Sequence, residues 1–209
     1  IRKQCLPKMI SASVGGAIVS WSDHRGTSWD VYVQKVDSGG RAQWESNGVR
    51  ICSSEADLWR QEIVDDGSEG AIVTWGRDSL VFQECRSIYA QRIGDSGVVQ
   101  WHSDGVLVCD TTWSRGYPQI TSDGLDGAIV SWVDCRRGYY DVYVQRIDSY
   151  GTPHWLRNGL QVFSAPYSDD FSKFHGPQIL SDQNNGAIIV WIYGIVMVGT
   201  YYYEVYASR

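Results

Sequence analysis

Gly16-Ala17-Ile18-Val19-Ser20-Trp21 is a phrase that occurs four times in this chain. It returns at residues 70–75 as GAIVTW, at 127–132 as GAIVSW and at 186–191 as GAIIVW. The tryptophans that end successive copies are 54, 57 and 59 residues apart. A period of this length indicates a repeat architecture, in which each copy is one structural unit packed against the next.

The third copy shows most clearly what one unit contains. Residues 118–121 and 128–133 are short apolar segments joined by an Asp-Gly turn, and residues 141–147 alternate apolar and polar side chains. Alternation with period two is typical of a half-buried β-strand, and Asp-Gly is a common hairpin turn. A fourth short strand is expected at residues 160–162. Four antiparallel strands in one repeat, with no helical periodicity, indicate the blade of a β-propeller.

We therefore predict an all-β protein, a β-propeller built of four-stranded antiparallel blades. Four blades are expected, at residues 1–54, 55–111, 112–165 and 166–209. The last blade is expected to lack its outermost strand, because Arg209 falls within its third strand. An unpaired third strand would be an exposed edge, so we expect these residues to be part of a larger ring or array.

A longer motif accompanies the phrase. The third copy carries Asp123-Gly124, Trp132-Val133-Asp134, Arg136, Asp141-Val142-Tyr143 and Gln145-Arg146-Ile147-Asp148. This motif resembles repeats of secreted and surface proteins from Bacteroidetes-type bacteria and some archaea, which read DG-x-GGAIVxWxDxRxGxxDIYxQRIDxxGxxxWxxxGVxIC. The resemblance covers essentially the whole chain. It implies a β-propeller in an exported protein, located outside the cell or on its surface, and it implies no reaction.

The composition narrows the range of partners. The net charge is −6 and the chain has no run of Lys or Arg, which argues against a nucleic acid as the partner. The longest apolar stretch, residues 186–198, is shorter than a membrane helix and is interrupted by Tyr193 and Gly194, so no membrane insertion is expected.

Two repeated groups of charged residues could be read as ligand sites. Asp23 and Arg25 follow Trp21, and Asp134 and Arg136 follow Trp132. An acidic ligand site or a calcium loop is one interpretation, but a structural clip that closes the turn is favoured, because the pair recurs at one blade position. The Asp-Gly turns beginning near Asp65, Asp123 and Asp182 offer carboxylates for calcium as well. Turn chemistry alone explains them, so no cofactor is expected, with calcium as the alternative.

Catalytic signals are weak. The chain has no nucleophile elbow, P-loop or HExxH motif. A propeller glycosidase needs two carboxylates facing each other across the central depression, and the expected inner strands offer one, Glu62. The sequence therefore favours a protein that is not an enzyme.

Departures from the repeat are concentrated in two blades. The tryptophan that ends the phrase and the tyrosine of the next Val-Tyr or Ile-Tyr pair are 11 residues apart in the first and third copies, 14 in the second and 15 in the fourth. The inserts lie in the turns between second and third strands, and the connection before the fourth blade is also long. In propellers these turns and the connections between blades emerge on the same face, so we expect all of them on one face. Their aromatic residues form a candidate ligand-binding face; the alternative is that they pack against neighbouring blades. The residues are Phe82, Tyr167, Phe171, Phe174, Tyr193, Tyr201 and Tyr202.

Three functions are compatible with these sequence features. The leading prediction is a non-enzymatic secreted or cell-surface propeller that acts as a structural or protein-interaction module. The alternative is a glycan-binding, lectin-like propeller, and the third is a fragment of a propeller glycoside hydrolase or lyase. The expected partner is a protein or a glycan on the face with the irregular loops, or else the remaining blades of the same protein or a second copy.

Overall fold

The structure is a computed structural model that describes residues 3–13, 15–52, 57–78, 86–110, 114–165, 174–197 and 200–209. In this part of the chain all regular secondary structure is β-strand, which confirms the predicted all-β class. The same residues contain no helix that is long and apolar enough to cross a membrane. The strands are β1 (Gln4–Ser11), β2 (Ala17–Asp23), β3 (Asp30–Val36), β4 (Val49–Arg50), β5 (Leu58–Asp65), β6 (Ala71–Asp78), β7 (Arg86–Ile93), β8 (Val106–Cys109), β9 (Ser114–Ser122), β10 (Ala128–Asp134), β11 (Asp141–Ile147), β12 (Leu160–Phe163), β13 (Phe174–Ser181), β14 (Ala187–Met197) and β15 (Thr200–Ser208).

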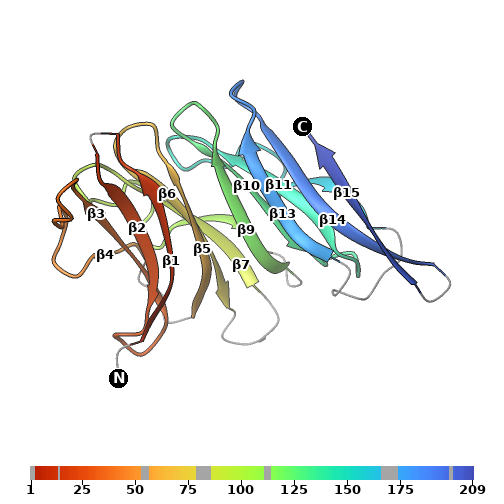
Figure 1. Ribbon diagram of the computed structural model, residues 1–209, viewed down its shortest axis with the longest axis horizontal. Coiled ribbons are helices and arrows are strands. Elements are labelled where there is room, and N and C mark those ends of the chain that lie inside the picture. Colours follow the sequence, from red (N-terminus) through yellow and green to blue (C-terminus); the bar gives the residue numbers. More distant parts are fainter. Residues whose placement is uncertain are drawn as a thin grey trace.

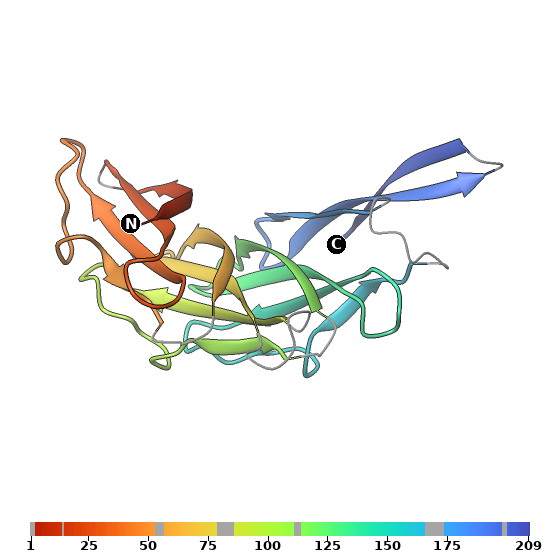
Figure 2. The ribbon, with the colours of Figure 1, turned by 90° about the horizontal axis from the view of Figure 1, so that it is seen from below.

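The strands pair in chain order into four antiparallel sheets. Blade 1 is β1-β2-β3-β4, blade 2 is β5-β6-β7-β8, blade 3 is β9-β10-β11-β12, and blade 4 is β13-β14-β15. The innermost strands of successive blades are neighbours, because β1 contacts β5, β5 contacts β9, and β9 contacts β13. The blades follow one another in an arc, with blades 1 and 4 at its two ends (Figures 1 and 2). The predicted β-propeller fold is thus confirmed, and the described sheets do not close into a ring.

The repeated phrase forms the second strand of each blade, and its tryptophan stacks on a tyrosine of the third strand. In each blade the two residues are direct cross-strand partners, their ring centroids are 5.9 to 6.3 Å apart, and their planes lie within 25° of parallel. Aromatic cross-strand pairs of this kind stabilise a sheet beyond the area that they bury. The four pairs are Trp21–Tyr32, Trp75–Tyr89, Trp132–Tyr143 and Trp191–Tyr206.

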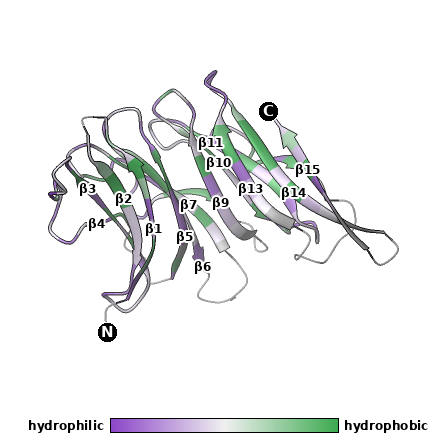
Figure 3. Ribbon diagram, in the orientation of Figure 1, coloured by the Kyte–Doolittle hydropathy of each residue, from purple (hydrophilic) through white to green (hydrophobic). Residues whose placement is uncertain are grey.

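The hydrophobic core lies between blades rather than within any one of them. One cluster joins Val31 of blade 1 to Trp75 of blade 2, a second joins Ile88 of blade 2 to Trp132 of blade 3, and a third joins blades 3 and 4. Figure 3 shows the hydrophobic residues concentrated on the middle strands β2, β10 and β14. A sheet has two faces to bury, so each blade is stabilised by the blades packed against it.

The turn before the outermost strand carries a glycine for a steric reason. Gly159 has a φ of +90°, and a Cβ at that position would overlap the Trp132 ring and the Val144 carbonyl oxygen. Gly48 and Gly105 occupy the same place against Trp21 and Trp75. The glycine of each Asn-Gly or Asp-Gly pair therefore leaves room for the tryptophan that decides the fold.

Blade 4 departs from the other three in two ways. Its third strand, β15, has no fourth strand beside it among the described residues. In addition, β14 and β15 pair continuously from Ile189 and Ser208 out to Met197 and Thr200, so the insert that the sequence led us to expect as an irregular loop extends a regular hairpin. This hairpin projects beyond the other blades (Figure 2). The expectation of an irregular loop is therefore wrong for the part of the insert that the structure describes.

Candidate functional site

A cavity of about 440 Å³ lies where the innermost strands of blades 1, 2 and 3 meet. Every residue that lines it belongs to β1, β5 or β9: Leu6, Lys8, Arg60, Gln61, Glu62, Tyr117, Pro118 and Gln119. Ligand sites in proteins are usually concave, with a few convergent polar groups on an apolar lining. This cavity therefore is our candidate site.

A β-bulge shapes the same part of each inner strand. The pairing register shifts between Cys5 and Lys8 in β1, between Trp59 and Glu62 in β5, between Gly116 and Gln119 in β9, and between His175 and Gln178 in β13. Within the bulges Leu6, Arg60 and Tyr117 have φ values of 53°, 52° and 55°, in the left-handed region that residues other than glycine rarely adopt. Bulges and strained backbone are concentrated near functional sites, where they redirect side chains.

The sequence contains a signal for these bulges that our predictions did not include. Pro7, Pro118 and Pro177 occupy one repeat position, directly after the bulge residue. Proline lacks a backbone N–H, so inside a sheet it is found at edges and bulges. In blade 2 the position holds Gln61, which is fully buried and bridges two blades: its Nε2 donates to the Leu6 carbonyl oxygen, and its Oε1 accepts from Ser22 Oγ at 2.9 Å.

A row of polar side chains crosses the inner strands two residues after each bulge. Lys8 Nζ lies 2.6 Å from Glu62 Oε1, and Gln119 Nε2 donates to the same oxygen at 3.3 Å. Gln178 Nε2 lies 3.5 Å from Gln119 Oε1, which extends the row into blade 4. The Glu62 side chain keeps 21% of its surface exposed, so this carboxylate is held in place by two neighbours and is still accessible from the cavity.

The bulge residues of blades 2 and 3 form a second contact in the cavity. The Arg60 guanidinium carbon lies 3.7 Å from the centroid of the Tyr117 ring, which is a cation–π contact. The corresponding residue of blade 4 is Gly176, where a Cβ would lie 3.3 Å from that of Tyr117. The described lining of the cavity thus combines one carboxylate, two cations, two amides and an aromatic ring. Of these residues, Glu62 alone was noted from the sequence, as the one acidic residue of the expected inner strands.

The Asp-Arg pairs at the turns between second and third strands form the predicted clips. Asp23 is fully buried and accepts hydrogen bonds from Arg25 Nη2 at 2.5 Å, Gln4 Nε2 at 2.7 Å and Trp21 Nε1 at 3.0 Å. Burial by itself favours the neutral acid, but these hydrogen bonds outweigh it and lower the pKa of Asp23 to about 2. The Arg25 guanidinium also lies 3.7 Å from the Tyr32 ring, so the clip extends the tryptophan–tyrosine stack.

The clip of blade 3 has the same arrangement. Arg136 Nη2 lies 2.6 Å from Asp134 Oδ2 and donates to the Asn158 carbonyl oxygen at 2.8 Å, and the guanidinium carbon lies 3.8 Å from the Tyr143 ring. Blades 2 and 4 have no such clip, because Arg77 and Tyr193 replace the aspartate. The buried indole N–H groups of Trp75 and Trp191 accordingly have no hydrogen-bond partner among the described residues.

The turn aspartates considered for calcium are occupied by the protein itself. Asp123 Oδ1 accepts the backbone N–H groups of Leu125 and Gly127, and its Oδ2 lies 2.8 Å from Arg146 Nε. Asp66 and Asp182 have equivalent bonds to Arg92 and Arg209. Among the described residues no group of three His, Cys, Asp or Glu side chains is arranged to hold a metal ion.

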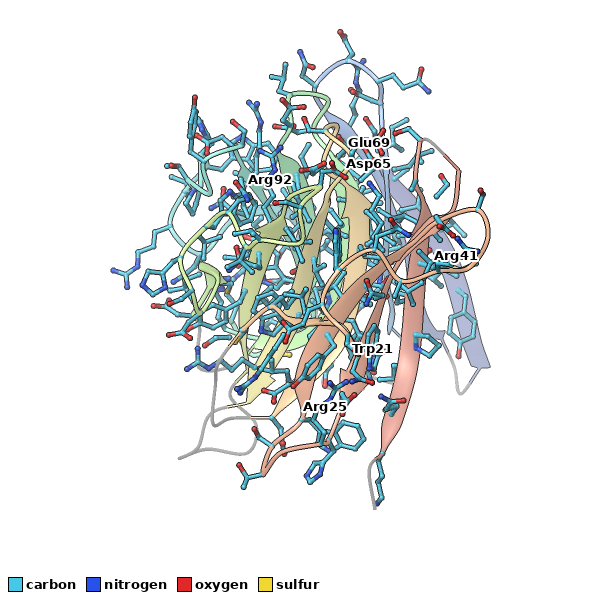
Figure 4. All side chains as sticks on the ribbon, turned by 90° about the vertical axis from the view of Figure 1, so that its left-hand side faces the viewer. Trp21, Arg25, Arg41, Asp65, Glu69 and Arg92 are labelled. Atoms are coloured by element: carbon cyan, nitrogen blue, oxygen red, sulfur yellow. The ribbon has the colours of Figure 1, made fainter. Side chains whose placement is uncertain are left out.

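These turns lie at the opposite end of the blades from the clips. Figure 4 shows Trp21 and Arg25 toward one end, and Asp65, Glu69 and Arg92 toward the other. At the latter end Lys35 Nζ of blade 1 lies 2.6 Å from Asp95 Oδ1 and 3.3 Å from Glu69 Oε2, both in blade 2. The acidic turns therefore serve to join blades.

The predicted aromatic ligand-binding face is only partly described. Phe82, Tyr167 and Phe171 lie outside the described residues, while Phe174 begins β13 and Tyr201 and Tyr202 belong to β15. Tyr193 is 3% exposed and its ring centroid lies 5.6 Å from that of Phe163, so it packs between blades 3 and 4. This burial removes Tyr193 from the exposed face on which we expected it.

Comparison with known proteins finds similarity among solved structures. No protein-family model matches the chain, and no curated protein matches by sequence. Among solved structures, an endo-arabinase from Bacteroides thetaiotaomicron VPI-5482 is similar over 97% of this chain and 74% of its own, with a TM-score of 0.53 and 17% sequence identity. At this identity the likeness shows the fold.

The match also corrects the leading functional prediction. We expected a non-enzymatic module because the repeat motif is scaffold consensus and a catalytic pair is not visible in it. A solved structure that shares the fold is an endo-arabinase, which contradicts both the non-enzymatic function and the expectation that the protein is not an enzyme. A scaffold motif describes the blades and carries no information on the cavity that their inner strands enclose, so the motif could not indicate an enzyme.

Proposed function

We propose that this chain contributes to a carbohydrate-acting propeller of the glycoside-hydrolase type, with the glycan bound in the cavity between β1, β5 and β9. The observation that carries this proposal is the Glu62 carboxylate, which is exposed to the cavity and held by Lys8 at 2.6 Å and Gln119 at 3.3 Å. The fold that it shares with an endo-arabinase supports a glycan as the substrate class.

The chemistry of glycoside hydrolysis defines the role of Glu62. Such enzymes use two carboxyl groups on opposite sides of the scissile bond, one as the acid and the other as base or nucleophile. Glu62 lies 2.6 Å from the Lys8 ammonium on the cavity lining, and we assign its carboxylate the role of base or nucleophile. Because Glu62 is the single carboxylate among the described residues that line the cavity, we expect the general acid to come from outside this lining.

The surrounding residues fit the binding of a sugar. The Gln119 amide and the Lys8 ammonium offer hydrogen-bond donors, and Tyr117 adds an aromatic ring. The resemblance of the repeats to those of exported proteins supports a location outside the cell, where the protein would have access to polysaccharides.

The test is a comparison of Glu62→Gln with the parent chain on a panel of polysaccharides that begins with arabinan. Release of reducing ends and binding by calorimetry would both be measured. We expect hydrolysis to fall at least about a hundredfold in Glu62→Gln, whereas binding changes less, because a catalytic carboxylate contributes mainly in the transition state. The matched control is Glu45→Gln, since Glu45 is an exposed glutamate on the turn before β4.

Two outcomes would contradict the proposed hydrolase function. If the parent chain neither binds nor cleaves any glycan of the panel while its fold is intact, the proposal is wrong. If it binds a glycan and cleaves none, the protein is a glycan-binding propeller, and Glu62 has no catalytic role.

A further inference from the structure

We infer that the cavity selects an acidic glycan, one whose sugars carry carboxylates, and that Arg60 is the residue that recognises the carboxylate. This inference rests on the proposed function, because it names the substrate class of the same site. It is carried by the position of Arg60, by the absence of a carboxylate partner for it among the described residues, and by the charge balance of the cavity.

Arg60 departs from the repeat at a position that the fold does not require to be charged. The corresponding bulge residues are Leu6, Tyr117 and Gly176, so the backbone accepts an aliphatic side chain, an aromatic one or none. Arginine at a φ of 52° costs conformational energy compared with glycine. A charged residue on a strained backbone at the edge of a cavity is a feature that structure alone does not explain.

The guanidinium of Arg60 is held but not neutralised. One face lies 3.7 Å from the centroid of the Tyr117 ring, and within the described part of the chain no carboxylate pairs with Arg60. Stacking uses the face of the guanidinium and leaves the N–H groups at its edge free, which is the geometry that binds a carboxylate through two parallel hydrogen bonds. The ring thus orients Arg60 for an anion supplied by a ligand.

The charge balance of the cavity points the same way. Lys8 and Glu62 are paired and cancel, so Arg60 leaves the lining with one net positive charge. The whole chain has a formal charge of −6, so this site is opposite in sign to the protein around it. A neutral sugar would leave the Arg60 charge without a partner, whereas a uronate would neutralise it on binding.

The experiment compares two linear polysaccharides, polygalacturonate and arabinan, with the parent chain and with Arg60→Asn. Asparagine tolerates the left-handed backbone, so the variant keeps the bulge while the charge is lost. The matched control is Arg41→Ala, which removes an exposed arginine from the turn after β3. Arg60→Lys is the second variant, because it keeps the positive charge and loses the bidentate hydrogen-bonding edge of the guanidinium.

We expect the parent chain to bind polygalacturonate more tightly than arabinan, and this preference to weaken as salt is raised from 50 to about 300 mM. Arg60→Asn should weaken polygalacturonate binding by about tenfold or more and change arabinan binding by less than about twofold. Arg60→Lys should recover part of the loss, and Arg41→Ala should have no effect.

Each contrary outcome identifies what is wrong. If arabinan binds at least as tightly as polygalacturonate, or if Arg60→Asn binds polygalacturonate like the parent, the acidic-glycan inference is overturned and the proposed function stands. If a folded parent chain binds neither these nor any other glycan, the proposed function is overturned, and the inference falls with it.

Discussion

Blades 3 and 4 contain nearly the same phrase and bury it to different extents. In blade 3 all seven residues of β10 are buried, because blade 2 lies on one face, blade 4 on the other and β12 beyond β11. In blade 4 the equivalent phrase lies in β14, where Ile188 is 43% exposed, and Val205 on β15 is 74% exposed. The difference shows that the phrase specifies a strand and a tryptophan–tyrosine stack, while its burial depends on the neighbouring blades.

The two blades differ in polar contacts as well. Trp132 donates to Asp134 at 3.4 Å, and Arg136 completes a clip, whereas Trp191 has a buried N–H with no partner in the described structure. Blade 4 compensates through apolar contact: Phe163 of blade 3 lies 5.1 Å from the Trp191 ring and 5.3 Å from Tyr206, centroid to centroid. A buried donor without a partner costs about 1–3 kcal/mol, so blade 4 is expected to be the less stable of the two.

The largest expected effect comes from placing one lysine in each blade. Val142 and Val205 occupy equivalent register positions, opposite Val133 and Ile192, yet Val142 is fully buried. Val142→Lys should lower the free energy of unfolding by more than about 4 kcal/mol, because it buries a charge without a partner. Val205→Lys should change it by less than about 0.5 kcal/mol. Urea unfolding followed by tryptophan fluorescence would measure both, and equal losses would contradict the proposed difference in burial.

A smaller effect is expected from removing the clip of blade 3. Asp134→Ala should cost about 2–3 kcal/mol, since it leaves Arg136 half-buried without its carboxylate and removes the acceptor of Trp132. The control is Arg157→Ala, which breaks the 3.2 Å pair with Asp110 at a side chain that is 85% exposed and should cost less than about 1 kcal/mol. A loss for Asp134→Ala no larger than that of the control would show that the clip does not stabilise the blade.

The third effect is a pH dependence in blade 1, where the same clip contains Asp23. Its pKa is about 2 in the folded chain and about 4 in an unfolded one, so the folded state favours the ionised form. This stabilisation is fully present above about pH 4 and is lost as the pH falls toward 2, and it amounts to about 2 kcal/mol. Burial raises the pKa of the neighbouring Asp30, which acts in the opposite direction but above pH 4.

The measurement is the free energy of unfolding between pH 5 and 2 for the parent chain and for Asp23→Asn. The variant should be less stable at pH 5 and should lose less stability on acidification. Asp126→Asn is the control, because Asp126 is exposed in a turn and asparagine accepts its φ of 62°. Parallel pH profiles for the parent chain and Asp23→Asn would show that the clip does not titrate as described.

Much of the fold could be predicted because the information was local and repeated. The period of the tryptophans, the alternation in residues 141–147 and the Asp-Gly turns all describe short segments whose conformation depends on near neighbours. The Asp23–Arg25 and Asp134–Arg136 pairs were equally accessible, because residues two apart at a hairpin end must lie close together. The bulges were signalled by the three repeated prolines, and that signal was overlooked.

The candidate site could not be predicted in the same way. Lys8, Glu62 and Gln119 are 54 and 57 residues apart, and only the packing of three inner strands brings their side chains into one row. Tyr193 shows the reverse case: an aromatic residue in an insert looked available to a ligand, and the packing of Phe163 from another blade buries it. Contacts between blades depend on how sheets stack, which no short segment encodes.

The amino-acid sequence alone specifies the repeated blade. Each blade has a strand that ends in tryptophan and a partner strand with tyrosine, and blades 1 to 3 have a turn with glycine where the tryptophan edge leaves no room for a side chain. The tertiary structure decided which copies are buried, which tryptophans find a hydrogen-bond acceptor, and which residues face one another across the inner strands. The physical reason is that hydrogen bonding and turn geometry act over a few residues, whereas burial and a binding cavity arise where separate sheets meet.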